Sequence, residues 1–585
     1  MECSWTVSFS KFPFFICVIS CLWHSGLRPA SAATFYISPN GNDKAAGLTP
    51  DQAWRTVRKV NHTVFSPGDT ILFEGGATFK GPVKLDMHDG GTPDNPILLG
   101  SYPDVGEKKA TISAGEGRGI DVYNTSGLRI TGLNIVGAGP DINKQSGIIL
   151  LSSQDAGASH VWIDDVDVSG FGKYGISIGA WNTKTGYRNV RITHCSTHDN
   201  LRAGIFTWGP WGPAIYAHRG IHFSDCKAYN MKGGSGITLS SVDGGIVERC
   251  VAHNNGTEFS GAAGIWAWDS NNILLQFNES FRNRTIGVDG DGFDFDGGVT
   301  NSVMQYNYSH DNDAAGFLLA QYAFAPQAMR NIIIRYNISE NDCRKNPYGA
   351  IHVWNDESAN RINGVQIYQN TIYLASASDK TKAGILHLIQ AGLRAFGLLP
   401  GAMIEPSAIA VISPTKGISV HNNLFFTSGG GMLVAVVDKQ EDLKFQNNAY
   451  WSDGQPFQVD WKGVIYNSFS DWLKAAGDQE RIGSRILAIQ ADPMLAGPGT
   501  GGTVGNPNLL HTLTGYKLKS GSPLTRRGIN LSRAFGIDPG SHGFFGTPVS
   551  LENPPAIGAN VVAGNPSKES DEVPSSAGIH EATSL

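Results

Sequence analysis

The sequence predicts an all-β chain wound into a parallel solenoid, and two observations carry that prediction. Six segments between residues 190 and 342 share one template: alternating apolar residues, then Cys or Asn, then a small polar residue and a polar turn. Their anchors follow one another at steps of 31, 24, 28, 29 and 30 residues, which is the mark of a repeat architecture. No helical periodicity runs through this region. The anchors are Cys195, Cys226, Cys250, Asn278, Asn307 and Asn337.

Each repeat contains two short β-type runs, one before the anchor and one that follows a small residue, usually glycine. Two such strands and their turns account for one turn of chain, so we expect each rung to lie about 4.8 Å above the last. The second runs are GISIGAW (175–181), GIFTWG (204–209), GITLSS (236–241), GIWAWD (264–269), GFDFDG (292–297), GFLLAQ (316–321) and AIHVWN (350–355).

The repeated Asn is expected to point inward and to bond to the next rung, because an amide can satisfy buried backbone at a bend. Weaker copies of the anchor are expected at Asn370, Asn423 and Asn447. The three Cys anchors should occupy the same slot as packing residues. The sequons NES, NYS and NIS are then not glycosylation sites, because their Asn is predicted to be buried.

The two ends of the chain differ in composition from this repeat. The apolar run FPFFICVISCLW (12–23) and the following Ala30-Ser31-Ala32 are typical of a signal peptide over 1–32, cleaved near Ala32. We therefore expect a secreted or periplasmic protein with no membrane segment after signal removal, a retained anchor being the alternative. Residues 562–585 lack aromatics and are expected to form a disordered tail. A formal net charge of −6 does not favour a nucleic-acid partner.

Two further stretches suggest how the solenoid begins and ends. FYISPNGNDKAAGLTPDQAWRTVRKVN (35–61) with SPGDTILFEGGATFKGPV (66–83) resembles the start of secreted right-handed parallel β-helix proteins of the pectate-lyase-like superfamily. DPMLAG (492–497), YKLKSGSPLTRRG (516–528) and AIGA (556–559) resemble their usual ending. The resemblance implies a single-stranded right-handed β-helix domain over 33–561, with a short N-terminal capping helix near Pro50–Val60.

Within that domain we expect the cap and first rungs at 35–100, an insertion at 376–415 and a C-terminal cap at 490–561. The segment KAGILHLIQAGLRAFGLLPG (382–401) in the insertion reads as an amphipathic helix or a lid. The superfamily includes pectate lyases, polygalacturonases, alginate epimerases and non-catalytic binding proteins, so the fold alone does not give the chemistry.

The stretch GVDGDGFDFDGG (287–298) holds four carboxylates within eight residues. If Phe293 and Phe295 point into the core, strand alternation turns Asp294 and Asp296 outward together, roughly 6.5–7 Å apart. That separation fits the pair of carboxyl groups of an inverting glycosidase. We therefore predict Asp294 and Asp296 as the acid/base pair, with Asp269 as a reserve carboxylate.

The same register lines up the outer positions of the other rungs and gathers tryptophans on one face. Flat indole rings suit the apolar faces of sugars, so this face predicts a carbohydrate groove, unless the loop 252–263 or the insertion near 380–410 covers it. In line with Asp294 are Ser177, Phe206, Thr238, Trp266, Leu318 and His352; in line with Asp296 are Gly179, Trp208, Ser240, Trp268, Ala320 and Trp354. The predicted site residues are catalytic His352 and substrate-binding Trp208, Trp266, Trp268, Trp354 and Arg284.

The acidic stretch allows other interpretations. Asp289 and Asp291, with Asp294, could ligate calcium as hard oxygen donors, although the spacing is not that of an EF-hand. A solvated glycine-rich turn is the plainest alternative. We expect a monomeric enzyme acting on a polysaccharide, a glycosidase rather than a lyase. The alternatives are a lyase or uronate epimerase using calcium with Arg284 or His352, and a non-catalytic glycan-binding or surface protein.

Overall fold

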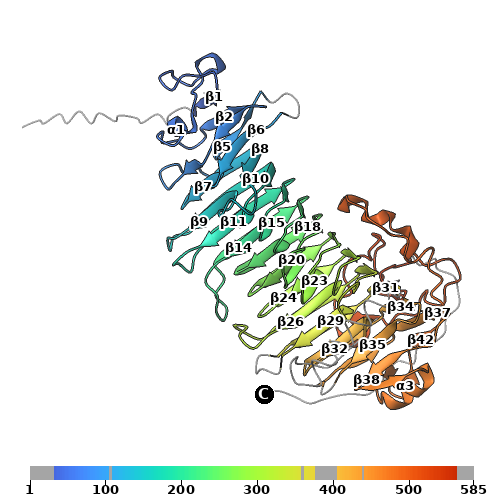
Figure 1. Cartoon of the computed structure of the whole chain (residues 1–585). Coiled ribbons are helices and arrows are strands. Elements are labelled where there is room, and N and C mark those ends of the chain that lie inside the picture. The colour runs from blue at the N-terminus through green and yellow to red at the C-terminus, as the bar shows by residue number, and fades with distance from the viewer. Residues whose placement is uncertain (1–31, 104–107, 357–360, 376–404, 438–439, 563–585) are drawn as a thin grey trace, which may run out of the picture.

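The chain forms a right-handed parallel β-helix, as predicted (Figure 1). The computed structural model describes residues 32–103, 108–356, 361–375, 405–437 and 440–562. One sheet, called sheet B here, contains the second strand of each rung. Its strands are β4 (Val83–Leu85), β7 (Ile120–Tyr123), β9 (Ile148–Ser152), β11 (Tyr174–Ala180), β14 (Ala203–Trp208), β17 (Ser235–Ser240), β20 (Ala262–Trp268), β23 (Asp289–Phe295), β26 (Phe317–Gln321), β29 (Gly349–Asn355), β32 (Ser407–Ile412), β35 (Met432–Val436), β38 (Val459–Trp461) and the antiparallel β39 (Val464–Tyr466).

The remaining parallel strands form a second sheet, sheet A, in two ladders joined through the long strands β8 (Leu128–Gly137) and β10 (Ala158–Ser169). The first ladder also has β1 (Thr34–Ile37), β2 (Thr70–Glu74), β5 (Ile97–Tyr102), β12 (Tyr187–Thr193), β15 (His218–Ser224), β18 (Val242–Glu248), β21 (Asn271–Gln276), β24 (Thr300–Gln305), β27 (Arg330–Arg335), β30 (Asn363–Tyr368), β33 (Lys416–His421) and β36 (Lys444–Gln446). The second ladder has β3 (Thr78–Lys80), β6 (Ala110–Gly115), β13 (Ser196–His198), β16 (Lys227–Tyr229), β19 (Val251–His253), β22 (Glu279–Phe281), β25 (Tyr308–His310), β28 (Ile338–Glu340), β31 (Thr371–Ala375), β34 (Leu424–Ser428), β37 (Ala449–Asp453) and β42 (Ile489–Gln490).

A continuous apolar core fills the inside of the coil, because inward side chains of one rung stack on those of the next. Phe293 of β23 is fully buried and stacks on Phe317 of β26, with ring centroids 5.3 Å apart. Phe295 is also fully buried. The predicted inward orientation of these phenylalanines is therefore confirmed.

The asparagine ladder is confirmed, with one correction. Each amide Nδ2 donates to the Oδ1 of the next rung, at 2.9 to 3.1 Å, and all the ladder side chains are fully buried. The last member is Asn448 rather than Asn447, whose side chain bonds instead to Asn422 and to the carbonyl of Arg527. The ladder is Asn278, Asn307, Asn337, Asn370, Asn423 and Asn448. Buried, unpaired Cys195, Cys226 and Cys250 occupy the same slot on earlier rungs.

Short helices lie near both ends of the coil. At the N-terminal end, η1 (Pro50–Gln52) and α1 (Val57–Val60) occupy the stretch where a capping helix is expected, and α1 buries Val57 and Val60 in the core. At the other end lies α3 (Phe469–Ala475) (Figure 1). Its fully buried Trp472 packs on the rings of Tyr450 and Trp461. The small hairpin β40 (Arg481–Ile482) and β41 (Arg485–Ile486) follows.

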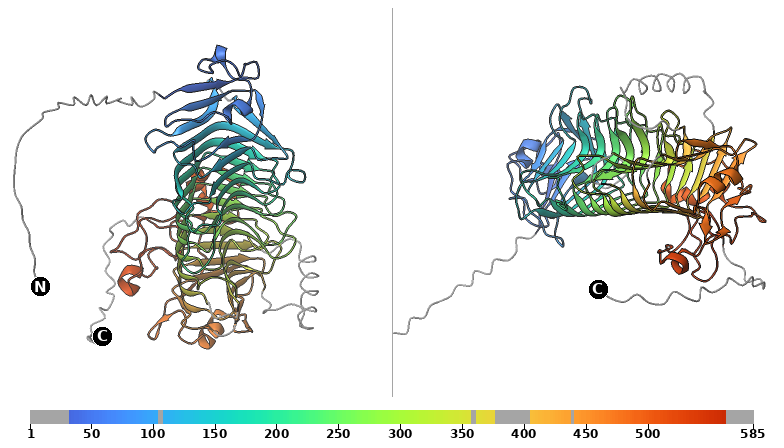
Figure 2. Two further views of the ribbon diagram at one scale, coloured as in Figure 1. Left: turned by 90° about the vertical axis from the view of Figure 1, so that its left-hand side faces the viewer. Right: turned by 90° about the horizontal axis from the view of Figure 1, so that it is seen from below.

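The expected C-terminal cap at 490–561 lies along the flank of the coil, on the outer side of sheet A (Figure 2). This segment includes η2 (Pro507–Thr512), η3 (Thr514–Tyr516) and α4 (Leu531–Phe535). The Glu279 carboxylate of β22 accepts the backbone N–H groups of Val504 and Gly505 at 2.7 and 2.6 Å. Tyr306, Tyr336 and Tyr368 donate to carbonyls of residues 538–542.

The signal peptide expected at 1–32, the tail expected at 562–585 and the helix or lid expected at 382–401 lie almost wholly outside the described residues. The expected insertion at 376–415 is too long, because β32 (Ser407–Ile412) is a regular strand of sheet B paired with β29 and β35. No helix in the described ranges is long and apolar enough to cross a membrane.

Candidate active site on sheet B

The outer positions of sheet B line up as the sequence predicts. Ser177, Phe206, Thr238, Trp266, Asp294, Leu318 and His352 are successive cross-strand partners. In the second column Gly179 pairs with Trp208, Ser240 with Trp268 and Ala320 with Trp354. The sheet therefore brings the predicted tryptophans and the acidic strand onto one face.

The four carboxylates of the acidic strand differ in how far they are covered. Asp291 is fully buried and its Oδ1 accepts the backbone N–H of Ala315 at 2.7 Å. Asp294 is only 6% exposed, which is less than an outward-facing catalytic acid needs. Asp289 and Asp296 are both partly exposed. The two carboxylates that a ligand can reach are therefore Asp289 and Asp296.

Burial raises the pKa of all four groups, and the charges of neighbouring carboxylates add to the rise for Asp291, Asp294 and Asp296. The pKa of Asp296 is raised to about 8, mainly by burial, and the charge of Asp289 adds to the rise. Burial also raises the pKa of Asp289, but there the Tyr348 hydroxyl donates a hydrogen bond at 3.1 Å that favours the ionised form. The pKa of Asp294 is raised first by burial and then by the charges of Asp296, Asp291 and Asp289. Asp296 thus keeps its proton near neutral pH, while the hydrogen bond from Tyr348 offsets part of the rise in the pKa of Asp289.

Asp269, the predicted reserve carboxylate, lies at the edge of the same cluster. Its backbone N–H donates to the carbonyl of Gly297 at 2.9 Å, and its side chain is fully buried. Its Oδ2 accepts the backbone N–H of Gly212 at 3.3 Å, whereas Oδ1 has no partner among the described residues. Burial raises the pKa of Asp269 to about 7. It can tune the charge of the site, but it cannot reach a ligand without movement.

Tyr322 is a site residue that the repeat alignment missed. The charges of Asp296, Asp294 and Asp269 all raise the pKa of its phenol, after the effect of burial, so its hydroxyl lies within electrostatic reach of all three. The ring lies directly over Gly297, where an added Cβ would be 2.4 Å from Tyr322 Cζ. Tyr322 lies just after the end of β26, outside the aligned strand positions. The sequence signal for it was Gly297, because a glycine allows a ring to lie close to the backbone.

The aromatic surface includes residues from loops as well as from the aligned strands. Trp208, Trp266, Trp268 and Trp354 are each partly exposed, and Trp208 Nε1 donates to Ser177 Oγ at 2.9 Å. From the loop after β14, Trp211 lies 5.9 Å from the Trp268 ring and 6.4 Å from Phe324. Trp211 and Phe324 are 50% and 67% exposed. These aromatics border the acidic cluster, and together they are called the aromatic rim below.

His352 is buried beside the cluster and is neutral near physiological pH. Its Nδ1 accepts the backbone N–H of Gly349 at 3.0 Å, and its ring lies 4.5 Å from that of Tyr348. Burial lowers the pKa of His352 to about 3. Because it is 3% exposed, His352 supports Tyr348, and through it Asp289, rather than meeting a substrate.

The structure does not bring Arg284 to the tryptophans, and it does not assemble the expected calcium ligands. Arg284 lies in the turn before β23, where it forms an ion pair with Asp313 at 2.8 Å. Asp289 bonds to Tyr348 and Asp291 to backbone, so their oxygens are directed to different partners. Among the residues that the structure describes, no group of three or more His, Cys, Asp or Glu side chains is placed to hold a metal ion.

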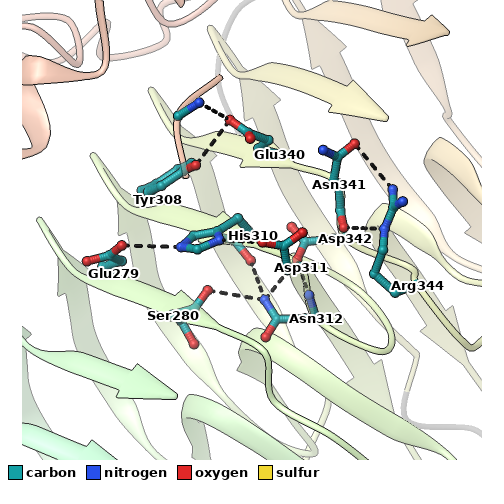
Figure 3. Close-up of polar contacts among 12 residues, drawn as sticks. Glu279, Ser280, Tyr308, His310, Asp311, Asn312, Glu340, Asn341, Asp342 and Arg344 are labelled. Carbon is teal, nitrogen blue, oxygen red and sulfur yellow. Dashed lines mark hydrogen bonds and ion pairs between the residues drawn. The ribbon is translucent and has the colours of Figure 1, made fainter. Parts of the chain in front are cut away.

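A second polar cluster lies on sheet A (Figure 3). There His310 contacts Glu279 at 3.2 Å and Asp311 at 3.0 Å, and Glu340 accepts from the Tyr308 hydroxyl at 3.1 Å. His310 and Glu279 are fully buried, and Glu279 is capped by backbone of the C-terminal segment. This cluster therefore anchors that segment and is closed to a substrate.

Comparison with known proteins agrees with this architecture. A family model described as "Right handed beta helix region" matches residues 209–372. A structure of a GH136 lacto-N-biosidase from Eubacterium ramulus, a selenomethionine derivative, superposes with a TM-score of 0.50 at 20% identity, over 59% of this chain and 64% of that one. The chain therefore shares the right-handed parallel β-helix fold with these proteins.

One curated protein shows a sequence relationship. The lacto-N-biosidase of Bifidobacterium longum subsp. longum is 22% identical in a 458-residue alignment that covers 60% of this β-helix chain. The chain spans only 28% of the length of that relative.

Proposed function

We propose that this protein is a glycoside hydrolase that binds a glycan along the aromatic rim and cleaves it at Asp296 and Asp289. The observation that carries the proposal is a pair of reachable carboxylates in different hydrogen-bond environments. Asp296 keeps its proton near neutral pH, because its pKa is about 8, while Tyr348 hydrogen-bonds Asp289 and favours its anion. Two carboxyl groups whose environments separate their pKa values are the usual acid and base of glycosidases.

In this proposal Asp296 donates its proton to the glycosidic oxygen as the bond to the leaving sugar breaks. The Asp289 carboxylate then meets the positive charge that develops at the anomeric carbon, either by direct attack or by taking a proton from an attacking water. Buried Asp294 lies between the two in sequence and does not touch the substrate in this proposal, and the charges of Asp296, Asp291 and Asp289 add to the rise of its pKa that burial causes. Tyr322, over Gly297, fixes the side of Asp296 from which the sugar approaches.

Two further observations support hydrolysis rather than elimination. The curated relative and the GH136 structure are both named lacto-N-biosidases, which are glycosidases. Elimination needs a cation to neutralise the carboxylate of a uronate beside the base, yet Arg284 is held by Asp313. In this proposal the sugar at the cleavage point is neutral, because the acidic cluster would repel the carboxylate of a uronate placed there.

The proposal is tested with the purified chain on a panel of polysaccharides and oligosaccharides. We expect new reducing ends without the ultraviolet absorbance of an unsaturated product, and loss of activity in both Asp296→Asn and Asp289→Asn. Asp51→Asn, at an exposed position in η1, is the matched control and should keep full activity.

Three results would argue against the proposal. Unsaturated products would identify a lyase, and binding without any turnover would identify a glycan-binding protein. Full activity in Asp289→Asn, with loss only in Asp294→Asn, would return the second catalytic role to Asp294.

A further inference from the structure

Sheet B carries a second feature, three rungs from the acidic cluster on the N-terminal side. A pocket of about 440 Å³ opens there over β9, β11 and β14. Its floor is aromatic, because Tyr174 and Phe206 stack with centroids 4.5 Å apart and an interplanar angle of 9°. Trp208 of the aromatic rim lines the same pocket, so the two features are continuous.

The edge of this pocket is cationic. Arg118, Lys173 and Arg202 line it, and none of the lining residues is acidic. Arg118 is oriented by an ion pair with Asp121 at 2.8 Å. Lys173 and Arg202 are exposed and form no ion pair with another described residue. The Arg202 guanidinium lies beside the Tyr174 phenol and opposes the rise of its pKa that burial causes.

The charge on the outer face of sheet B therefore changes sign between the pocket and the acidic cluster. Phe206 of the pocket and Asp294 belong to one register column, separated by Thr238 and Trp266. Three rungs correspond to about 14 Å at a spacing of about 4.8 Å. A uniformly acidic polymer would be attracted at the pocket and repelled at the acidic cluster, whereas a neutral one would leave two cations unpaired.

We propose that the pocket binds an anionic sugar residue, carrying a carboxylate or a sulfate, of a glycan whose cleaved residue is neutral. The aromatic floor contacts the face of the sugar, and Lys173 and Arg202 pair with its charge. This inference rests on the proposed function, because that function sets the direction in which the glycan lies across sheet B. It narrows the substrate class to mixed neutral and acidic glycans.

The test is binding to an array of oligosaccharides in which each backbone is present in neutral, C6-carboxylated and sulfated form. The protein is the full chain carrying Asp296→Asn, so that the probes are not cleaved. We expect anionic members to bind about tenfold more tightly than their neutral counterparts, as a pair of charge-assisted contacts at an open site would give. A preference for carboxylated or for sulfated members distinguishes the two sources of charge.

A matched pair of double variants locates the effect. Lys173→Gln with Arg202→Gln should remove the preference, while Arg188→Gln with Lys227→Gln, an equal loss of charge at exposed positions of sheet A, should retain it. Equal affinity for neutral and anionic members, or a preference that survives the first double variant, overturns the inference.

The two proposals fail separately. A wild-type chain that prefers anionic members but cleaves no glycan supports the pocket and refutes hydrolysis. A wild-type chain that cleaves glycans without any preference for charge refutes the pocket and supports hydrolysis.

Discussion

Asp296→Asn should lower activity and raise stability in the same molecule. Folded Asp296 keeps its proton up to a pKa of about 8, whereas an unfolded aspartate loses it near 3.8. Between these two values the unfolded chain binds fewer protons than the folded one, so the free energy of unfolding falls as pH rises. About four pKa units at 1.36 kcal/mol each give a loss of up to about 5 kcal/mol by pH 8.

The Asn variant carries no proton to lose, and its Oδ1 can still accept the Gly297 N–H that now binds Asp296 at 2.9 Å. Its stability relative to wild type should therefore rise from pH 4 to pH 8 by several kcal/mol, with most of the gain above pH 5. Its activity should fall by about 10²- to 10⁴-fold, the usual contribution of a general acid.

Urea unfolding of both proteins at pH 4, 6 and 8 measures the first effect, and the comparison across pH cancels any fixed cost of the substitution. Release of reducing sugar from the best panel substrate measures the second. A stability difference that does not change with pH would refute the raised proton affinity of Asp296. An Asn variant with more than a tenth of wild-type activity would refute its role as the acid.

Three other substitutions test separate parts of the structure. Asn337→Ala removes the four hydrogen bonds of the Asn337 side chain at about 1 kcal/mol each and should cost about 4 kcal/mol in urea unfolding, against less than about 1 kcal/mol for exposed Asn508→Ala in η2. Gly297→Ala should displace Tyr322 and lower kcat up to about a hundredfold, without a change in the unfolding midpoint of more than about 2 kcal/mol. Glu279→Gln should make residues 499–505 sensitive to limited proteolysis, while activity on short substrates stays at the wild-type level.

The repeat made the fold predictable from sequence. Strand alternation and the spacing of the Asn anchors decide which residues of each rung share a slot, so the columns through Asp294 and Trp268 follow directly. The one wrong prediction within the ladder was Asn447 in place of Asn448, because the two asparagines are adjacent and periodicity cannot choose between them.

The site was less predictable, because its decisive features come from outside the aligned strands. Tyr322 and Trp211 belong to turns, and no periodic pattern places a turn residue. Alternation placed Asp294 outward correctly, but it could not show that neighbouring groups cover the side chain to 6% exposure. The spacing of acids alone suggested calcium as one alternative for Asp289, whereas in the structure Asp289 accepts a hydrogen bond from a tyrosine two rungs away.

The C-terminal segment on the flank has a consequence for the order of synthesis. The N–H groups that satisfy Glu279 belong to Val504 and Gly505, more than two hundred residues later in the chain. At about 5–20 residues per second, a ribosome reaches Val504 roughly eleven to forty-five seconds after Glu279. During that interval the acids and tyrosines on the outer side of sheet A are exposed to solvent. They become covered only when the C-terminal segment, which is synthesised last, packs on them.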